Sequence, residues 1–157
     1  VADTLGGADD QTAVVHMRQN GVSDVSVMFY KVDDLSGSID GIDPGDARYG
    51  AATESRAYHL SDGGTWLQGS GYGQYGEGEI AGIDNGDIIA MRLHTGAGDD
   101  FYAFANANSD GQTAHLWGYG YNTWGWEDTA GGGDRDFNDL VVQLDFIGKQ
   151  LDSLLLA

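Results

Sequence analysis

The chain has 157 residues and no cysteine, and its 25 acidic and 7 basic residues give a formal net charge of -18. This charge disfavours nucleic acid as a partner, because phosphate backbones are also anionic. No apolar run reaches the ~20 residues of a membrane-spanning helix, and a hydrophobic content of 41% excludes general disorder. The length favours a single domain, which we expect over residues 1–147, with residues 148–157 as a C-terminal tail or linker.

The acidic residues are almost all aspartate, with 21 Asp against 4 Glu, and many of them adjoin one of the 26 glycines. Short carboxylate side chains beside tight, glycine-permitted turns are typical of loops that wrap a hard cation. The alternative is the acidic surface of a halophile protein, which would not require Asp to be clustered beside Gly. Without cysteine, neither disulfides nor thiolate metal sites are available, so the composition favours calcium.

Alternating apolar residues predict strands, in chain order, at residues 13–18, 25–30, 88–93, 101–107, 114–119 and 140–147. Asn20-Gly21 is a turn signal between the first two strands. Residues 44–60 contain the single proline and an alanine-rich body, which predicts one short helix. We therefore expect an all-β fold, an antiparallel β-sandwich or jelly roll with one short helix and long calcium-binding loops.

Residues 39–46 and 80–87 share the pattern I-x-G-I-D-x-G-D. Two copies are too few for a repeat architecture, and two similar glycine turns explain them. The first copy is also a weaker calcium candidate, because five aspartates crowd this stretch: Asp33, Asp34, Asp40, Asp43 and Asp46.

The strongest signal is the segment 125–139, in which five carboxylates fall within 13 residues around a glycine triplet. Such a density of negative charge favours a divalent cation that collects 6–8 oxygen ligands. A solvated acidic loop is the alternative, but its clustered acids would repel one another. The candidate metal ligands are Glu127, Asp128, Asp134, Asp136 and Asp139.

Residues 106–111 match the first half of a D-x-[DN]-x-[DN]-G calcium loop, with Asn106 at the first position. Position twelve is Trp117 rather than glutamate, so the segment is not an EF-hand. Asn108 and Asp110 are candidates for a second calcium site, and a plain polar turn is the alternative.

Residues 117–126 are dense in aromatic rings, and strand alternation places Trp117, Tyr119 and Tyr121 on one face. Burial statistics favour core packing for such a row, with a platform for a ligand as the alternative. The glycine-rich loop 69–78 is a candidate contact loop or an unstructured spacer. From these two segments the candidate ligand-contact residues are Tyr72, Tyr75, Tyr121 and Trp124.

No sequence motif indicates an enzyme. The four histidines are isolated, and the chain has neither a G-x-S-x-G motif nor a P-loop lysine. A pair of carboxylates can serve a glycosidase, but the acids here crowd one loop in the manner of cation ligands. We therefore expect a binding protein without catalytic residues.

Three segments together, residues 32–49, 108–115 and above all 126–139, resemble a domain near the C-terminus of large bacterial repeats-in-toxin (RTX) adhesins and related secreted calcium-binding proteins. The resemblance covers roughly residues 22–147. It implies a calcium-bound β-sandwich that serves as a ligand-binding module at the outer tip of an adhesin. In some such adhesins a domain of this kind captures protein C-termini with the help of calcium.

Carried over by position, the resemblance makes Asp128, Asp134, Asp136 and Asp139 calcium ligands, with Glu127 as a ligand or as an orienting group. An ion with an open coordination position would accept a ligand carboxylate or sugar hydroxyls. The amides of Gly131, Gly132 and Gly133 would then hold the remaining negative charge.

The expected protein is thus a non-enzymatic, peptide-binding adhesion module of the bacterial cell surface, secreted, binding more than one Ca²⁺ and active in cell adhesion and biofilm formation. It is expected to be a monomeric module of a larger chain, with a peptide, protein or glycan on another cell as its partner. The alternatives are a calcium-dependent lectin and a calcium-rigidified structural module without a ligand.

Overall fold

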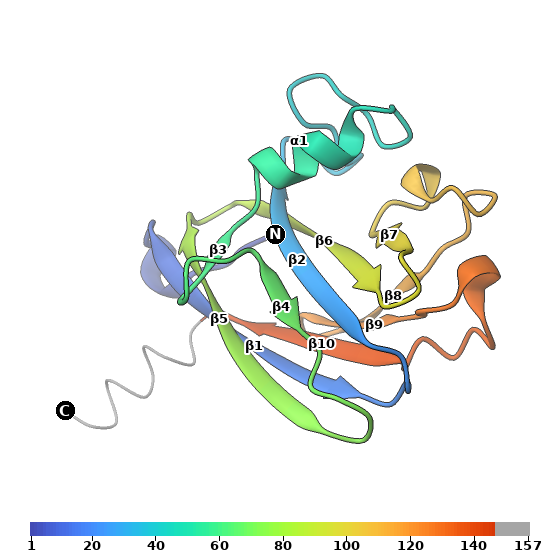
Figure 1. Cartoon of the computed structure of the whole chain (residues 1–157). Coiled ribbons are helices and arrows are strands. Elements are labelled where there is room, and N and C mark those ends of the chain that lie inside the picture. Colours follow the sequence, from blue (N-terminus) through green and yellow to red (C-terminus); the bar gives the residue numbers. More distant parts are fainter. Residues whose placement is uncertain (147–157) are drawn as a thin grey trace.

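The computed structural model describes residues 1–146, which form two antiparallel sheets packed face to face (Figure 1). The fold is therefore the all-β sandwich with one short helix that the sequence predicts. The expected tail at residues 148–157 and the last residue of the strand expected at 140–147 lie outside the described residues. Within the described residues, no helix is long and apolar enough to cross a membrane.

The larger sheet has six strands in the order β3-β5-β1-β10-β9-β8, and the smaller has four in the order β4-β2-β6-β7. The six strands are β3 (His59–Leu60), β5 (Tyr75–Ile83), β1 (Gln11–Gln19), β10 (Leu140–Asp145), β9 (Thr123–Trp126) and β8 (Leu116–Gly120). The four strands are β4 (Trp66–Gln68), β2 (Val25–Val32), β6 (Ile88–Thr95) and β7 (Asp100–Tyr102). The helix is α1 (Tyr49–Ser55), and three 3₁₀ turns occupy Leu5–Gly7, Ala105–Ala107 and Ala130–Gly132.

The main core lies between the sheets, where alternate residues of both inner faces are removed from water. Val15 and Val142 of the larger sheet pack there with Phe29 and Leu93 of the smaller one. Trp126, at the end of β9, is fully buried in the same core. Alternation along each strand then directs the remaining side chains to the outer faces.

The smaller sheet is also covered on its outer face, which explains why β2 is apolar at almost every position. Met28 and Tyr30 point away from the main core into a second cluster with Tyr49 and Ala52 of α1. Figure 1 shows α1 beside this sheet. The helix is shorter than the 44–60 segment predicted for it, and Pro44 lies in the loop before it.

The Asn20-Gly21 turn signal does not produce a hairpin, because β1 and β2 belong to different sheets. The segment between them crosses from one sheet to the other. The backbone amides of Asn20 and Gly21 both donate to the carbonyl oxygen of Asp139, at 2.9 and 3.0 Å. The turn is therefore fixed by the acidic loop that precedes β10 rather than by strand pairing.

The sequence analysis missed β5, a nine-residue strand that pairs with both β1 and β3. Its glycines weaken the strand signal but serve packing, since a Cβ on Gly78 would lie 2.7 Å from the side chain of Leu67 in the facing sheet. The strand predicted at 101–107 is also wrong beyond Tyr102, because the chain turns into the 3₁₀ segment Ala105–Ala107.

A buried carboxylate ties three segments of the sandwich together. Asp87 is 6% exposed, accepts hydrogen bonds from the Tyr58 hydroxyl at 2.8 Å and the Asp84 amide at 3.0 Å, and lies 2.8 Å from Lys31 Nζ. Burial opposes its ionisation, but Lys31, the Asp84 amide and the Tyr58 hydroxyl outweigh burial and hold the pKa of Asp87 below its usual 3.8.

We expect Asp87→Ala to lower the free energy of unfolding by about 2–4 kcal/mol at pH 7, because it strands the Lys31 and Tyr58 donors. Since the folded-state pKa is depressed, this contribution is complete above the unfolded-state pKa and is lost as the pH falls through the folded one. Urea denaturation at pH 7 and pH 3 should therefore show a smaller difference from wild type at pH 3. Asp3→Ala, at an exposed carboxylate, is the control. An equal loss at both pH values would contradict the assignment.

Candidate metal centre

The acidic segment 127–139 is the connection between β9 and β10, at one end of the six-stranded sheet. Trp126 and Leu140, which flank the segment, are paired residues of these two strands. The end of β1 and the start of β5 lie at the same end, because Gln19 pairs with Leu140 and Arg18 with Tyr75. Strand pairing thus gathers the acidic loop, the 20–21 turn and the 69–75 loop at a single end of the sheet.

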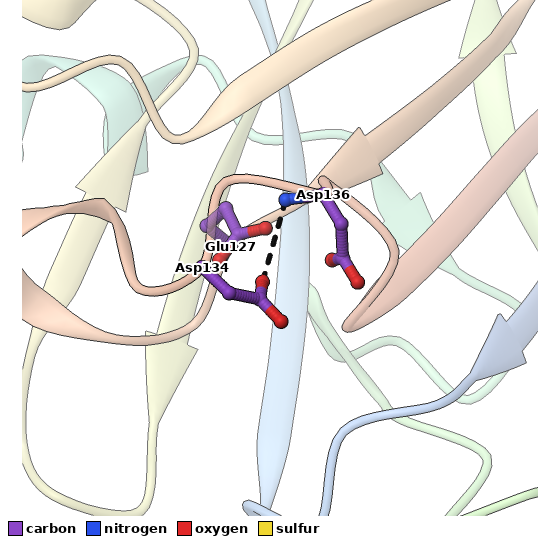
Figure 2. Close-up of side chains that lie close together, drawn as sticks. All are labelled: Glu127, Asp134 and Asp136. Carbon is purple, nitrogen blue, oxygen red and sulfur yellow. Dashed lines mark hydrogen bonds between the residues drawn. The ribbon is translucent and has the colours of Figure 1, made fainter.

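Three carboxylates of this loop converge. One oxygen from each of Glu127, Asp134 and Asp136 lies within 4.8 Å of the others, a separation at which one metal ion can contact all three. Figure 2 shows the three side chains on the two limbs of the loop. Glu127 is buried whereas Asp134 and Asp136 are exposed, so the cluster is closed on the protein side and open toward solvent.

The backbone of the loop turns its carboxylates toward the same place. Asp134 Oδ1 accepts the amide of Asp136 at 3.3 Å (Figure 2), and Asp136 Oδ1 accepts the amide of Asn138 at 3.3 Å. The amide of Phe137 donates to Glu127 Oε1. Gly133, Arg135 and Phe137 have positive φ, whereas Asp134 and Asp136 between them do not. The sign of φ therefore alternates from residue to residue around the two aspartates.

The loop folds back over the outer face of β9, where Gly125 leaves room for it. A Cβ on Gly125 would overlap the carbonyl oxygen of Phe137 and approach the Tyr119 ring to 2.7 Å. The Tyr119 hydroxyl donates to the carbonyl oxygens of Asp136 and Phe137, at 3.0 and 3.1 Å. The Phe137 ring packs on Trp117 with 5.9 Å between centroids. The loop is therefore held by the aromatic residues of β8.

Asp128 and Asp139 form a second pair on the side of the 20–21 turn. The Asp128 amide donates to Asp139 Oδ2 at 3.0 Å, and a Cβ on Gly21 would lie 2.9 Å from Asp128 Oδ2. These two predicted ligands lie in the same loop as the triad but are not part of the three-residue cluster.

The five carboxylates lack basic partners. Among residues 1–146 no salt bridge joins any of them to Lys, Arg or His. Burial, together with the charges of Asp139 and Asp134 and contact with Asp136, raises the pKa of Glu127 to about 7. Burial and the neighbouring Asp128 likewise raise the pKa of Asp139. Ionisation here is unfavourable until a cation is supplied.

Asn108 and Asp110, the second predicted site, support the first loop. The Asn108 side chain is buried and fully engaged, since it accepts from the Tyr102 amide and donates to the carbonyls of Tyr102 and Thr113. Asp110 Oδ2 accepts the Gly131 amide at 2.8 Å and lies 2.6 Å from His115 Nε2. Neither residue belongs to the metal cluster.

The sequence analysis missed His115, which joins the two loops. Its buried ring lies 3.7 Å from the Phe101 ring, centroid to centroid, and its Nδ1 donates to the Glu127 carbonyl at 2.9 Å. With Asp110 at the other nitrogen, the ring connects the Asp110 carboxylate to the Glu127 carbonyl. Burial opposes the charge on Asp110, but the Gly131 amide and His115 hold its pKa below the usual value. An isolated histidine in the sequence gives no signal of this role.

The four expected ligand-contact residues do not lie together in the structure. Tyr72 and Tyr75 are exposed at the end of the sheet that carries the acidic loop, with β5 about 14 Å from β9 across three strand spacings. Tyr121 is 95% exposed, but it occupies the β8–β9 turn at the opposite end. Trp124 packs against the core.

The exposed aromatic pair beside the loop is Trp117 and Tyr119, at 57% and 50% exposure, where the sequence analysis favoured core packing. Two of the glycine amides expected to bind an anion are engaged internally. The Gly131 amide donates to Asp110, and the Gly132 amide donates to the Thr129 carbonyl at 3.0 Å.

Three of the five aspartates in the weaker acidic stretch pair with arginines of the protein itself. Arg56 contacts Asp33 at 2.9 Å and Asp40 at 2.8 Å, and Arg48 contacts Asp46 at 2.9 Å. An arginine thus occupies the place where the sequence suggested a metal ion, and the stretch is not among the metal clusters of residues 1–146.

Comparison with known proteins gives one match. A protein-family profile described as "Domain of unknown function (DUF4114)" matches residues 78–147, less than half of the chain. The matched region runs from within β5 through β10 and includes the whole acidic loop. No curated protein and no solved structure matches the chain.

We expect Gly125→Ala to weaken divalent-metal binding roughly tenfold, because a side chain there displaces the Phe137 carbonyl and forced overpacking costs about 1–3 kcal/mol. Gly118→Ala in the adjacent strand is the matched control, since its Cβ would meet Trp124 at an ordinary 3.7 Å. Calorimetric titration with calcium measures both. Equal affinities for the two variants would show that the loop does not depend on this close approach.

The metal-free protein should lose stability as the pH rises from about 5 to 8. Because the pKa of Glu127 is raised to about 7 in the folded state, the folded protein binds more protons than the unfolded chain between 4.5 and 7. Comparison of the urea midpoints of wild type and Glu127→Gln in chelator isolates this contribution from that of the histidines. The urea midpoint of the variant should rise relative to that of wild type as the pH rises. Saturating calcium should remove this difference.

Proposed function

We propose that the chain is a non-enzymatic, calcium-dependent ligand-binding module of a secreted bacterial adhesin, and that it recognises protein C-termini on partner cells. The observation that carries the proposal is the convergence of Glu127, Asp134 and Asp136 without a basic partner in residues 1–146. Carboxylates are preferred ligands of calcium, and calcium accepts a more variable coordination geometry than magnesium, which requires a nearly ideal octahedron.

The exposure of the cluster supports binding in preference to a purely structural ion. Buried Glu127 would hold the ion from below, and exposed Asp134 and Asp136 would hold it from the sides. Coordination positions toward solvent are then available to a carboxylate from outside, such as a peptide C-terminus. The net charge of -18 repels anions in general, so recognition of a carboxylate here would depend on the metal.

The aromatic pair beside the loop offers a contact for the rest of the ligand. Trp117 and Tyr119 are half exposed and are fixed against the loop by Phe137 and its carbonyl. Rigid aromatic rings give contact area at a low entropic cost. A peptide that places its C-terminal carboxylate on the metal would lay its last side chains over these rings.

The test is capture of labelled peptides with free or amidated C-termini, in calcium and in chelator. We expect capture only of free C-termini and only in calcium, and Asp136→Asn should reduce it at least tenfold. Asp62→Asn is the matched control, because Asp62 accepts an amide in a turn of similar design outside the cluster. Saturation with calcium at about 100-fold over its Kd should raise the Tm of wild type by about 5–10 °C.

The other outcomes discriminate the alternatives. Capture that persists in chelator, with the protein still folded, refutes calcium dependence. Calcium-dependent binding of glycans without regard to peptide ends indicates a lectin. Calcium stabilisation without binding of either ligand class indicates a structural module.

A further inference from the structure

A depression on the outer face of the four-stranded sheet has the composition of a sugar-binding subsite. It has a volume of about 270 Å³ and is lined by Ser26, Glu54, Trp66, Arg92, His94 and Asp100. We refer to it as the Trp66 depression. Its volume lies just below the ~300–1,000 Å³ of pockets for drug-sized molecules, which suits one small unit of a ligand.

Strand pairing explains why the sheet is hollow here. Ser26 pairs with Gln68 and His94, and His94 pairs with Asp100, so these residues form one row across four strands. The next row, which includes Trp66 and Arg92, adjoins α1, where Arg92 contacts Glu54 at 3.5 Å. The small Ser26 side chain is the floor between longer neighbours at the edge of the helix.

Arg92 is fixed in place beneath the depression. Its side chain is 10% exposed, and its guanidinium contacts Asp100 at 3.1 Å, Thr53 Oγ1 at 3.2 Å and the Gly50 carbonyl at 3.3 Å. Its buried Nε has no hydrogen-bond partner among residues 1–146. Nε is closed to solvent, so a ligand in the depression would meet the rest of the side chain and the carboxylates paired with it rather than this nitrogen.

The other lining groups select the class of ligand. Asp100 also lies 2.9 Å from His94 Nδ1, and with Glu54 it provides carboxylate acceptors beside the arginine donor. A hydroxyl group can donate to either carboxylate, whereas an anionic ligand would be repelled by both. Trp66 adds an aromatic wall, with Arg92 Cζ 5.5 Å from its ring centroid and His94 edge-on at 5.9 Å.

We propose that the Trp66 depression binds a neutral pyranose unit of a glycan, with sugar hydroxyls donating to the carboxylates of Glu54 and Asp100 and the apolar face of the ring against Trp66. The site is independent of the candidate metal centre. The acidic loop lies on the outer face of the other sheet, so the two sites are on opposite sides of the sandwich.

The test uses neutral methyl glycosides of glucose, galactose and mannose as probes, observed by ¹H–¹⁵N NMR of the intact chain. At least one glycoside should shift the Arg92 Nε–H and Trp66 indole signals with millimolar affinity, equally in calcium and in chelator. Trp66→Ala should weaken binding about tenfold through loss of the aromatic contact. Ser26→Gln, which fills the floor and keeps every charged group, should abolish it.

Trp117→Ala is the matched control, because it removes an exposed tryptophan of the other sheet and should leave the shifts unchanged. The proposal is overturned if none of the glycosides shifts these signals. It is equally overturned if acetate shifts the Arg92 signal in their place, or if the sugar response disappears in chelator, because the first indicates a carboxylate site and the second places the sugar at the acidic loop.

Discussion

The close approach of the Phe137 carbonyl to Gly125 determines where the acidic loop can lie. With no side chain at this position of β9, the loop folds onto the outer face of the sheet, and Tyr119 fixes two of its carbonyls. Next to that anchor the sign of the backbone φ angle alternates from residue to residue, and the carboxylates of Asp134 and Asp136 converge with that of Glu127. The geometry of the candidate metal centre is therefore a consequence of strand packing as much as of the acidic residues themselves.

The distribution of the few basic residues explains why this cluster differs from the other acidic stretches. Arg56 neutralises Asp33 and Asp40, and Lys31 neutralises Asp87. In those places the protein supplies its own cation, so a metal ion would have to displace it. In the 127–139 loop no basic residue of the described chain does so, and a cation from solution can supply charge balance without competition.

The sequence located the acidic loop because its signal is local: five carboxylates around a glycine triplet, followed by a strand. It could not locate the residues that position this loop, because their role depends on contacts between distant segments. His115 connects Asp110 to the Glu127 carbonyl, and Gly125 matters only because Phe137 packs over it. Neither contact can be predicted from a periodic pattern in the sequence.

Most of the predicted strands are confirmed, but β5 was missed for a related reason. In β5, Gly78 leaves the space that the facing side chain of Leu67 requires, and the glycines at 76, 78 and 82 erase the alternation that marks a strand. The turns show the same limit. Asn20-Gly21 looks like a hairpin but connects two sheets, whereas the β8–β9 hairpin turns at Tyr121 and Asn122, both at positive φ. Asn accepts this conformation readily, but Tyr rarely does, so only pairing of the flanking strands reveals the turn.

The sandwich separates its two candidate binding surfaces by the whole thickness of the core. Because side chains alternate along each strand, the residues of each outer face stay out of the core, and each face has its own set of side chains. Trp117 and Tyr119 adjoin the loop in which the carboxylates of Glu127, Asp134 and Asp136 converge, so under the proposed function this surface would respond to metal. Trp66 instead lies on a sheet fixed by α1 and by the contacts of Arg92, none of which involves the acidic loop. A metal-sensitive surface and a metal-insensitive one on opposite faces would allow the chain to hold one ligand continuously and a second only when calcium is present.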